Sequence, residues 1–204
     1  MHGFVFVRQK NLDPTRHDVA TMGEQYLFIA MDSETKLIPS FLIGKRNIEN
    51  AYYLMEDLQS RLATRVQLTT DGFRPYVNAV DATFGTAIDY AMLVKTYAGD
   101  ESARERYSPS EIVDTRTVPV MGNPRPQRIS TSHVERQNLN VRMQMRRFTR
   151  LTNAFSKKLE NLKAALYLYF AWYNFCRVHS TLRVTPAMQA GISDHVWGCA
   201  ELLA

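Results

Sequence analysis

Residues 66–72 of this 204-residue chain read Val-Gln-Leu-Thr-Thr-Asp-Gly, and this stretch decides the fold class. Its first five residues alternate apolar with polar and are rich in β-branched side chains, which is typical of a strand. The pair Asp71-Gly72 that follows is a turn signal. A carboxylate at the carboxyl end of a strand, beside a glycine that lets a ligand approach closely, is a common position for metal and phosphate chemistry in α/β folds. An ordinary Asp-Gly turn gives the same pattern, so both interpretations of Asp71 stay open.

The segments on either side of this strand alternate in type. Apolar periodicity, together with glycine and proline positions, predicts the following elements: a strand at 4–7, a loop at 11–23, a hairpin of 26–32 and 37–42, a helix at 47–62, a helix at 74–84 that stops at Gly85, and a strand at 88–94. Three strands, a helix, a strand, a helix and a strand, followed by helices, predict an α/β fold with a mixed sheet.

A second informative stretch runs from Ser132 to Arg150 and is expected to be helical. Glu135 is its single carboxylate, and its other charges are arginines, which favour the ionised form of the acid. Such a helix suits a metal ligand next to polyanionic nucleic acid. Ser132 and Glu135 also have the spacing of a capping box, in which a glutamate reaches back to the first amide of the helix. This stretch alone does not choose between the two.

The rest of the chain predicts a long connection and more helices. Residues 96–129 hold four prolines and several charges, so we expect a mobile loop that either closes over DNA or is a plain surface linker. Residues 157–176 predict a long helix with one packing stripe of apolar and aromatic side chains, namely Leu159, Leu162, Leu166, Phe170 and Tyr173. Thr185-Pro186 suits the start of a short helix that ends at Gly191.

Composition bounds the class of protein. The net charge is +5, and the excess of base is concentrated in residues 101–150, as a nucleic-acid footprint requires, although a solvated basic face has the same charge. The two cysteines are too few for a zinc tetrad or a disulfide framework and favour a reducing compartment. The most apolar stretch, 164–175, is too short to span a bilayer. Nothing at the start is typical of a signal peptide, so we expect an intracellular protein without a membrane partner.

Taken together, Asp71, Glu135 and the arginines resemble the catalytic half of bacterial insertion-sequence transposases with a DDE (acidic triad) integrase core. Four segments carry the resemblance over nearly the whole chain: 4–11, 66–72, 132–158 and 173–179. The most specific is Val-Glu-Arg-Gln-Asn-Leu at 134–139 with Arg142 seven positions after the acid, which is similar to the family's acid-then-base helix signature. The resemblance implies an RNase H-like mixed β-sheet flanked by helices, with a C-terminal helical extension.

The resemblance also implies a domain layout and a reaction. Residues 1–150 would form the core, with the loop at about 96–129, and residues 151–204 the extension packed on it. The implied function is DNA transposition by metal-dependent strand cleavage and strand transfer. Asp71 and Glu135 would be catalytic and would bind Mg²⁺ (or Mn²⁺), because two such ions stabilise the attacking and leaving oxygens and prefer carboxylate ligands.

Four arginines of the same stretch would bind DNA phosphates, namely Arg136, Arg142, Arg146 and Arg150. His133 is a weaker candidate for a DNA contact. Tyr173, Asn174, Arg177 and His179 are similar to the family's closing motif, which implies that they pack the last long helix on the core. The implied partners are transposon ends and target DNA, bound by a homodimer or larger assembly in the bacterial cytoplasm, associated with the nucleoid.

One departure from the family pattern concerns its first catalytic aspartate. The family opens its catalytic strand with Asp-Glu-aliphatic-Trp-Ser-Phe-Val, and matching its Phe-Val to residues 4–5 puts the aspartate two positions before Met1. Asp32 is the only early substitute, but it is expected at a hairpin turn. We therefore expect either an N-terminally truncated transposase, inactive as given, or a catalytically inactive DNA-binding remnant.

Overall fold

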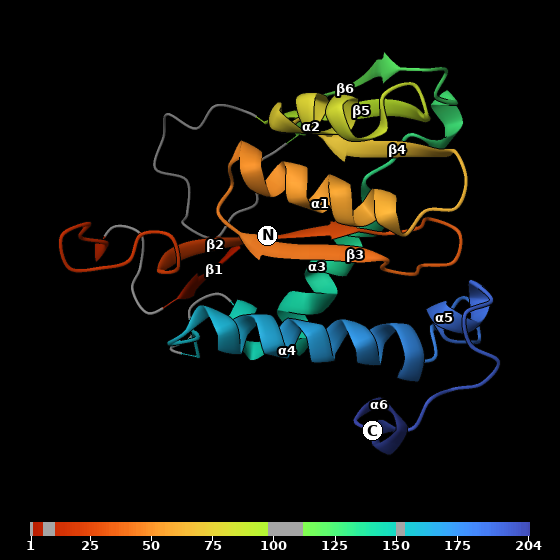
Figure 1. Ribbon diagram of the computed structural model, residues 1–204. Helices are drawn as coiled ribbons and strands as arrows, with labels where there is room; N and C mark the ends of the chain where they lie inside the picture. Colours follow the sequence, from red (N-terminus) through yellow and green to blue (C-terminus); the bar gives the residue numbers. More distant parts are fainter. Residues whose placement is uncertain (1, 6–10, 98–111, 150–153) are drawn as a thin grey trace. The chain divides into compact units, whose positions relative to one another are not determined.

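The computed structural model of the chain describes residues 2–5, 11–97, 112–149 and 154–204 (Figure 1). The chain forms two compact units. Unit 1 combines Met1–Arg61 with His133–Ala204, and unit 2 is Leu62–Ser132. This division does not coincide with a boundary at residue 150, because the C-terminal helices belong to the same unit as the first strands.

Unit 1 contains a three-stranded antiparallel sheet in the order β1-β2-β3. Its strands are β1 (His2–Val5), β2 (Gly23–Ala30) and β3 (Ser40–Gly44). The predicted hairpin is confirmed, although its second strand begins at Ser40, later than expected. Its turn is closed by the Asp32 amide, which donates to the Leu37 carbonyl over 2.9 Å, and by the Lys36 amide, which donates to the Asp32 carbonyl over 3.0 Å. Of the predicted strand at 4–7, residues 6 and 7 lie outside the described residues.

Two long helices cover the faces of this sheet. Helix α1 (Ile48–Ser60) begins where the Asn47 side chain accepts the Asn50 amide over 3.1 Å, and α4 is Leu159–Ala171. Figure 1 shows α1 and α4 on opposite faces of the sheet. The predicted stripe of α4 is buried together with sheet residues and with residues near α3 (Ser132–Gln144), including Val5, Leu27, Ile38, Ile43, Val141 and Phe148. The helix predicted at 157–176 is confirmed, with its last turn, Trp172–Cys176, wound as a π-helix.

The chain ends in two short helices. Helix α5 (Pro186–Gln189) begins at Thr185, whose hydroxyl accepts the Met188 amide over 3.2 Å, so the predicted cap is confirmed. Helix α6 is Cys199–Leu202. No described helix combines the length and the apolar composition that crossing a lipid bilayer requires.

Unit 2 contains a mixed three-stranded sheet in the order β4-β5-β6. Strand β4 (Val66–Asp71) runs parallel to β5 (Ile88–Tyr97), and helix α2 (Pro75–Phe84) connects them. The helix ends before Gly85, which has φ +51°, as the glycine predicted. Tyr90 is fully buried, and its hydroxyl lies 2.8 Å from the hydroxyl of Thr70. The chain is thus an α/β protein with a mixed sheet and flanking helices.

The expectation of a structureless connection over 96–129 is wrong for its second half. Residues 112–121 form strand β6 (Ile112–Met121), which pairs antiparallel with β5. The four prolines of residues 96–129 indicated a loop in the sequence, although the β-branched residues of 112–121 favour a strand. Pro119 is tolerated because β6 is an edge strand of the described sheet and its pairing with β5 shifts register beside the proline, between Tyr90 and Ala91. Residues 98–111 of the predicted loop lie outside the described residues.

Candidate functional site

Asp71 is the last residue of β4 and is exposed. Its Oδ1 accepts the Phe73 amide over 3.1 Å, which forms a tight local turn before α2. Gly72 passes close to β5, since a Cβ at that position would lie 3.3 Å from the Val94 side chain. The predicted placement at the carboxyl end of a strand is confirmed. The turn uses one carboxylate oxygen, and the exposed side chain leaves the acid accessible to a ligand.

Glu135 lies in the first turn of α3 and is exposed. An acid in the first turn is favoured by the positive end of the helix dipole. The capping box is out of register, because Ser132 is the first helical residue and Glu135 is therefore the fourth. The Ser132 hydroxyl lies 2.8 Å from the Ser130 hydroxyl, and its amide donates to the same oxygen over 3.2 Å.

The two predicted carboxylates belong to different units. Asp71 is in unit 2 and Glu135 in unit 1. Among the residues that the structure describes, no group of three or more His, Cys, Asp or Glu side chains is placed to hold a metal ion. Carboxylate oxygens are suitable donors for Mg²⁺, but the described acids do not form a complete ligand set.

Asp32 is committed to its own hairpin turn, as expected. Its Oδ1 accepts the Glu34 amide over 3.1 Å. Its Oδ2 accepts the amide of Thr35 over 3.2 Å and the hydroxyl of Thr35 over 2.5 Å. Both oxygens of the early candidate acid therefore stabilise the turn.

The four predicted DNA-binding arginines do not share one helix. Arg136 is exposed and Arg142 half-buried on α3. The helix ends at Gln144, because Met145 is extended and the chain turns to bury Phe148 in the core. Arg146 therefore lies on the separate 3-10 turn Arg146–Phe148, and the expectation that the helix continues past Gln144 is wrong. Arg150 lies outside the described residues.

Helix α3 packs against α4 through buried polar groups that the sequence analysis missed. Gln137 is 1% exposed, and its amide donates to the Tyr169 hydroxyl over 3.5 Å. That hydroxyl donates to the Gln144 side chain over 2.8 Å. Burial raises the pKa of Tyr169, so it stays a neutral donor. In the sequence, the signal that could have indicated this contact is the seven-residue spacing of Gln137 and Gln144.

The closing motif packs the end of α4 onto the hairpin. Asn174 accepts the Ile38 amide over 3.1 Å and donates to the Ile38 carbonyl over 2.9 Å. The Tyr173 hydroxyl donates to the Lys36 carbonyl over 3.2 Å. Arg177 lies over the Trp172 ring, 5.7 Å from its centre. The packing role that the resemblance implied is confirmed for Tyr173 and Asn174.

Cationic side chains gather near the start of α3. The Lys36 ammonium lies 3.3 Å from Nε2 of His133. Burial and Lys36 lower the pKa of His133. Burial, Arg177 and Lys36 lower the pKa of His179. Both imidazoles are therefore kept in their neutral form near pH 7, and the positive charge of this region comes from Lys36 and Arg177.

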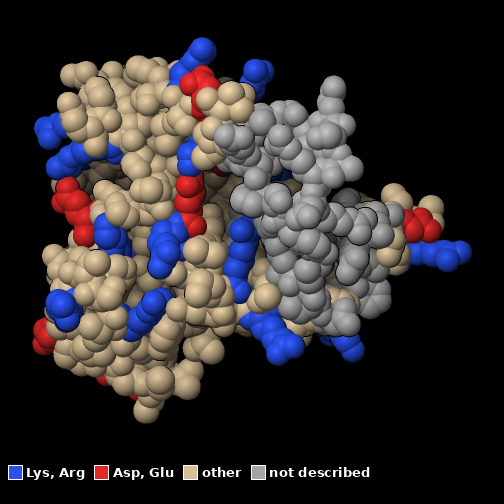
Figure 2. Space-filling model, turned by 180° about the vertical axis from the view of Figure 1, so that it is seen from behind, with Lys and Arg blue, Asp and Glu red and all other residues tan. Residues whose placement is uncertain are grey.

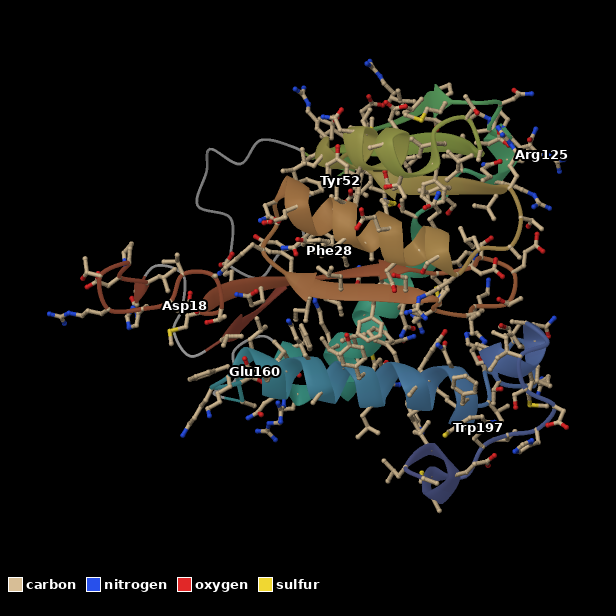
Figure 3. The ribbon with its side chains drawn as sticks, in the orientation of Figure 1. Asp18, Phe28, Tyr52, Arg125, Glu160 and Trp197 are labelled. Atoms are coloured by element: carbon tan, nitrogen blue, oxygen red, sulfur yellow. The ribbon has the colours of Figure 1, made fainter. Side chains whose placement is uncertain are left out.

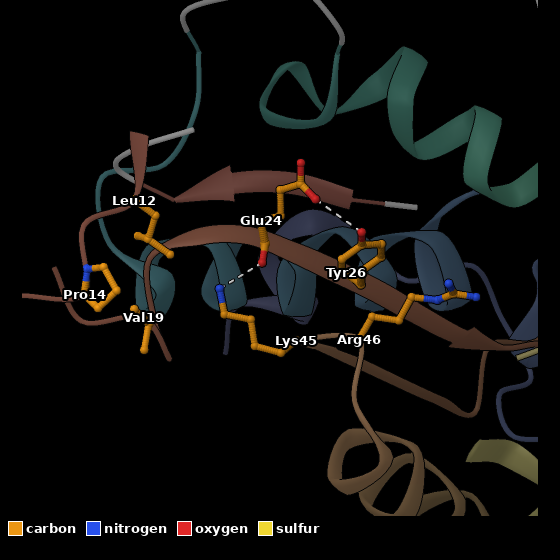
Figure 4. Close-up of a pocket in the computed structure, with 7 residues that line it drawn as sticks. All are labelled: Leu12, Pro14, Val19, Glu24, Tyr26, Lys45 and Arg46. Carbon is orange, nitrogen blue, oxygen red and sulfur yellow. Dashed lines mark hydrogen bonds between the residues drawn. The ribbon is translucent and has the colours of Figure 1, made fainter. Parts of the chain in front are cut away.

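An open pocket of about 670 Å³ lies elsewhere in unit 1, where β2 begins (Figure 4). It is lined by Leu12, Pro14, Val19, Glu24, Tyr26, Lys45 and Arg46. The Lys45 ammonium donates to the Glu24 carbonyl over 3.1 Å, and the Tyr26 hydroxyl donates to the Glu24 carboxylate over 3.2 Å. The lining contains none of the predicted site residues, and Glu24, Tyr26 and Lys45 already bond one another.

No family model, curated protein or solved structure matches this chain. The resemblance therefore rests on the sequence motifs themselves. Charge on the surface is mixed: Figure 2 shows Lys and Arg at many points of one face, several of them next to acidic side chains. Both cysteines are free thiols.

Proposed function

We propose that this chain is a DDE-type transposase, an enzyme that cleaves and joins DNA strands at the ends of an insertion sequence, with an RNase H-like core. The observation that carries the proposal is Asp71, an exposed carboxylate at the carboxyl end of a parallel strand. Glu135 would be the partner acid, on the arginine-bearing helix α3. The order of strands and helices through β5 is the one that the sequence patterns predicted.

DNA binding is supported by the basic groups of unit 1. Lys36, which lies beside His133, and the exposed Arg136 on α3 are suited to contact backbone phosphates near Glu135. Such contacts fix the position of DNA without reading its sequence. We extend the proposal to a homodimer or larger assembly in the bacterial cytoplasm, because transposition brings two DNA ends together.

Mg²⁺ (or Mn²⁺) would supply neutralisation of the charge that develops on the phosphate oxygens. Asp71 and Glu135 are the side chains proposed to hold it. The protein's own part is to present these two acids and to position the DNA through its arginines.

A second candidate function is DNA binding without cleavage. Asp32, the early substitute for the family's first catalytic aspartate, is held in its own hairpin turn, because both its oxygens accept hydrogen bonds there. This observation favours a binding protein that retains the fold.

A Mg²⁺-dependent plasmid-nicking assay separates the two functions. We expect no nicking by the chain as given, and nicking by a chain extended to carry an aspartate two positions ahead of Met1, because the three acids act as a unit. Asp71→Asn should abolish the restored activity. Robust nicking by the unextended chain would show that another acid completes the site, and no nicking by the extended chain would favour the binding protein.

Glu135→Gln in the extended chain tests the second acid. Glutamine is a neutral, poor ligand for Mg²⁺, so cleavage should fall by on the order of 10³-fold or more, roughly 4 kcal/mol of transition-state stabilisation. The melting temperature should stay within a few degrees of the parent. Ser132→Ala is the matched control, with cleavage retained and at most about 1 kcal/mol of stability lost. Full cleavage by Glu135→Gln would remove this residue from the catalytic site.

A further inference from the structure

Unit 2 has a second pocket, of about 210 Å³, at the end of its sheet where β4 and β5 begin. It is lined by Arg65, Val66, Gln67, Asp89, Asn123, Arg125 and Arg128. Asp71 lies at the other end of β4, roughly 17 Å away at about 3.3 Å per residue. Figure 3 shows Arg125 at the end of the sheet where β4 starts. The pocket is therefore distinct from the candidate catalytic acid of the same unit.

Arg125 is held in place by its backbone. The Gln67 side chain accepts the Arg125 amide over 2.8 Å and donates to the Arg125 carbonyl over 3.1 Å. Pro124 and Pro126 flank the arginine, and the latter restricts Arg125 to an extended conformation, with φ −70° and ψ 118°. The backbone is thus fixed, while the exposed guanidinium takes no hydrogen-bond acceptor among the residues that the structure describes.

The loop is anchored a second time at Gly122 and Asn123. Asp89 accepts the Asn123 amide over 2.8 Å and forms an ion pair with Arg65 at 2.7 Å. Gly122 has φ +65°, and a Cβ there would lie 2.2 Å from the Asp89 carboxylate. Only glycine allows this close passage. The loop from 122 to 128 is therefore fixed at two points before any ligand arrives.

The charge of the pocket favours an anion. Its lining has three arginines and one carboxylate, an excess of two positive charges. The Arg65 guanidinium and the Asn123 amide hold the pKa of the Asp89 carboxyl at about 2. Asp89 is therefore ionised and already paired with Arg65, so the lining as a whole keeps its excess of positive charge. The planar donors of arginine match the oxygens of a phosphate group.

We propose that this pocket of unit 2 binds a phosphate group through Arg125, with Arg128 in its lining. The phosphate belongs either to a nucleic-acid backbone or to a free inorganic ion. Gln67 is a positioning residue, because it fixes the backbone of Arg125 without contacting the ligand. The site does not depend on Asp71 or Glu135, so its test and the nicking assay fail or succeed separately.

Titration with inorganic phosphate tests the pocket directly. In the full chain, the side-chain N–H signals of Arg125 and Arg128 should shift and saturate as phosphate replaces chloride at constant ionic strength. Arg125→Ala should abolish the saturable shift of Arg128. Arg116→Ala removes the same charge from an exposed position on β6 and should leave the titration unchanged. Equal binding by Arg125→Ala, or equal loss in Arg116→Ala, would overturn the proposal.

Binding to a short labelled DNA duplex identifies the source of the phosphate. If the source is a DNA backbone, Arg125→Ala should reduce the slope of log K against log salt by about 0.9, and Arg116→Ala should not. If inorganic phosphate binding is lost in Arg125→Ala but the DNA slope is unchanged, the site takes the free ion. Unchanged behaviour in both assays contradicts the site itself.

Gln67→Ala removes the two hydrogen bonds that hold the Arg125 backbone and leaves the charge of the pocket unchanged. Phosphate binding should weaken on the order of threefold to tenfold, because Arg125 is then no longer fixed beforehand and must become ordered when the phosphate binds. The unbound protein should retain its melting temperature within a few degrees. Phosphate binding equal to that of the parent would show that Arg125 does not need the Gln67 hydrogen bonds and would remove Gln67 from the proposal.

Discussion

Asp89 shows how one side chain anchors a loop. Its carboxylate accepts hydrogen bonds from Nε and Nη2 of Arg65, over 3.2 and 2.7 Å, and from the Asn123 amide over 2.8 Å. These groups stabilise the charged form and lower the pKa of Asp89 to about 2. The ionised Asp89 carboxylate thus holds the loop that follows β6 through the Asn123 amide.

The Asp89 hydrogen bonds predict a pH dependence. A lowered folded-state pKa contributes stability that is present above the unfolded value near 3.9 and is lost as the pH falls through the folded value of about 2. Carboxyl NMR titration should therefore give Asp89 a pKa of about 2 in the parent, and Arg65→Ala should move it toward its ordinary value. The Asn123 amide should lose hydrogen-exchange protection between about pH 4 and 2. An unchanged Asp89 titration in Arg65→Ala would contradict the assigned cause.

At the scale of elements, the end of α4 is fixed to the β2–β3 hairpin by one side chain. The Asn174 side chain bonds both the amide and the carbonyl of Ile38, as the backbone of a neighbouring strand would. Ile38 is 3% exposed. The π-helical turn Trp172–Cys176 contains this asparagine. Such a turn is common at functional sites and here brings a polar side chain to the hairpin.

Asn174→Ala should therefore destabilise the protein by about 2–3 kcal/mol, because it leaves two backbone groups of Ile38 without partners. The midpoint of urea unfolding measures this loss. Asn161→Ala, at an exposed position of the same helix, is the matched control and should change stability by about 0.5 kcal/mol or less. Equal midpoints for the two variants would assign no structural role to the closing asparagine.

At the scale of the whole molecule, positive charge is distributed over both units rather than on one helix. Unit 1 carries Lys36, beside His133, and the exposed Arg136, and unit 2 carries the arginine pocket. Arg146 lies beyond the end of α3, so it and Arg142, both proposed to bind DNA, belong to separate elements.

Salt-dependent DNA binding by the full chain measures these contributions. Arg142→Ala with Arg146→Ala should weaken binding to all sequences alike and reduce the salt slope by about 0.9 for each phosphate that the variant no longer neutralises. Arg16→Ala is the control, since its side chain is 82% exposed and lies outside α3 and its flanking turn. A slope unchanged in the double variant would assign both arginines to roles within the protein or in solvent.

The sequence by itself determined the local elements and their order. Alternation predicted β4, apolar periodicity predicted α1, α2 and α4, and Thr185-Pro186 predicted the start of α5, because these signals depend on neighbours within one turn or strand. The buried stripe of α4 was predicted for the same reason. The positions of Asp71 at a strand end and of Asp32 in a turn also followed from local patterns.

Only the tertiary structure decided what depends on distant partners. Strand β6 forms because β5 offers it a pairing edge, which outweighs its proline. Helix α3 ends at Gln144 because Phe148 enters the core, and Gln137 can be buried because α4 supplies Tyr169 as its partner. The arginine pocket brings together residues from 65 to 128, with Gln67 bonding Arg125 across the sheet end. Such contacts between residues far apart in the chain leave no periodic signal in the sequence, so they are seen only in the folded structure.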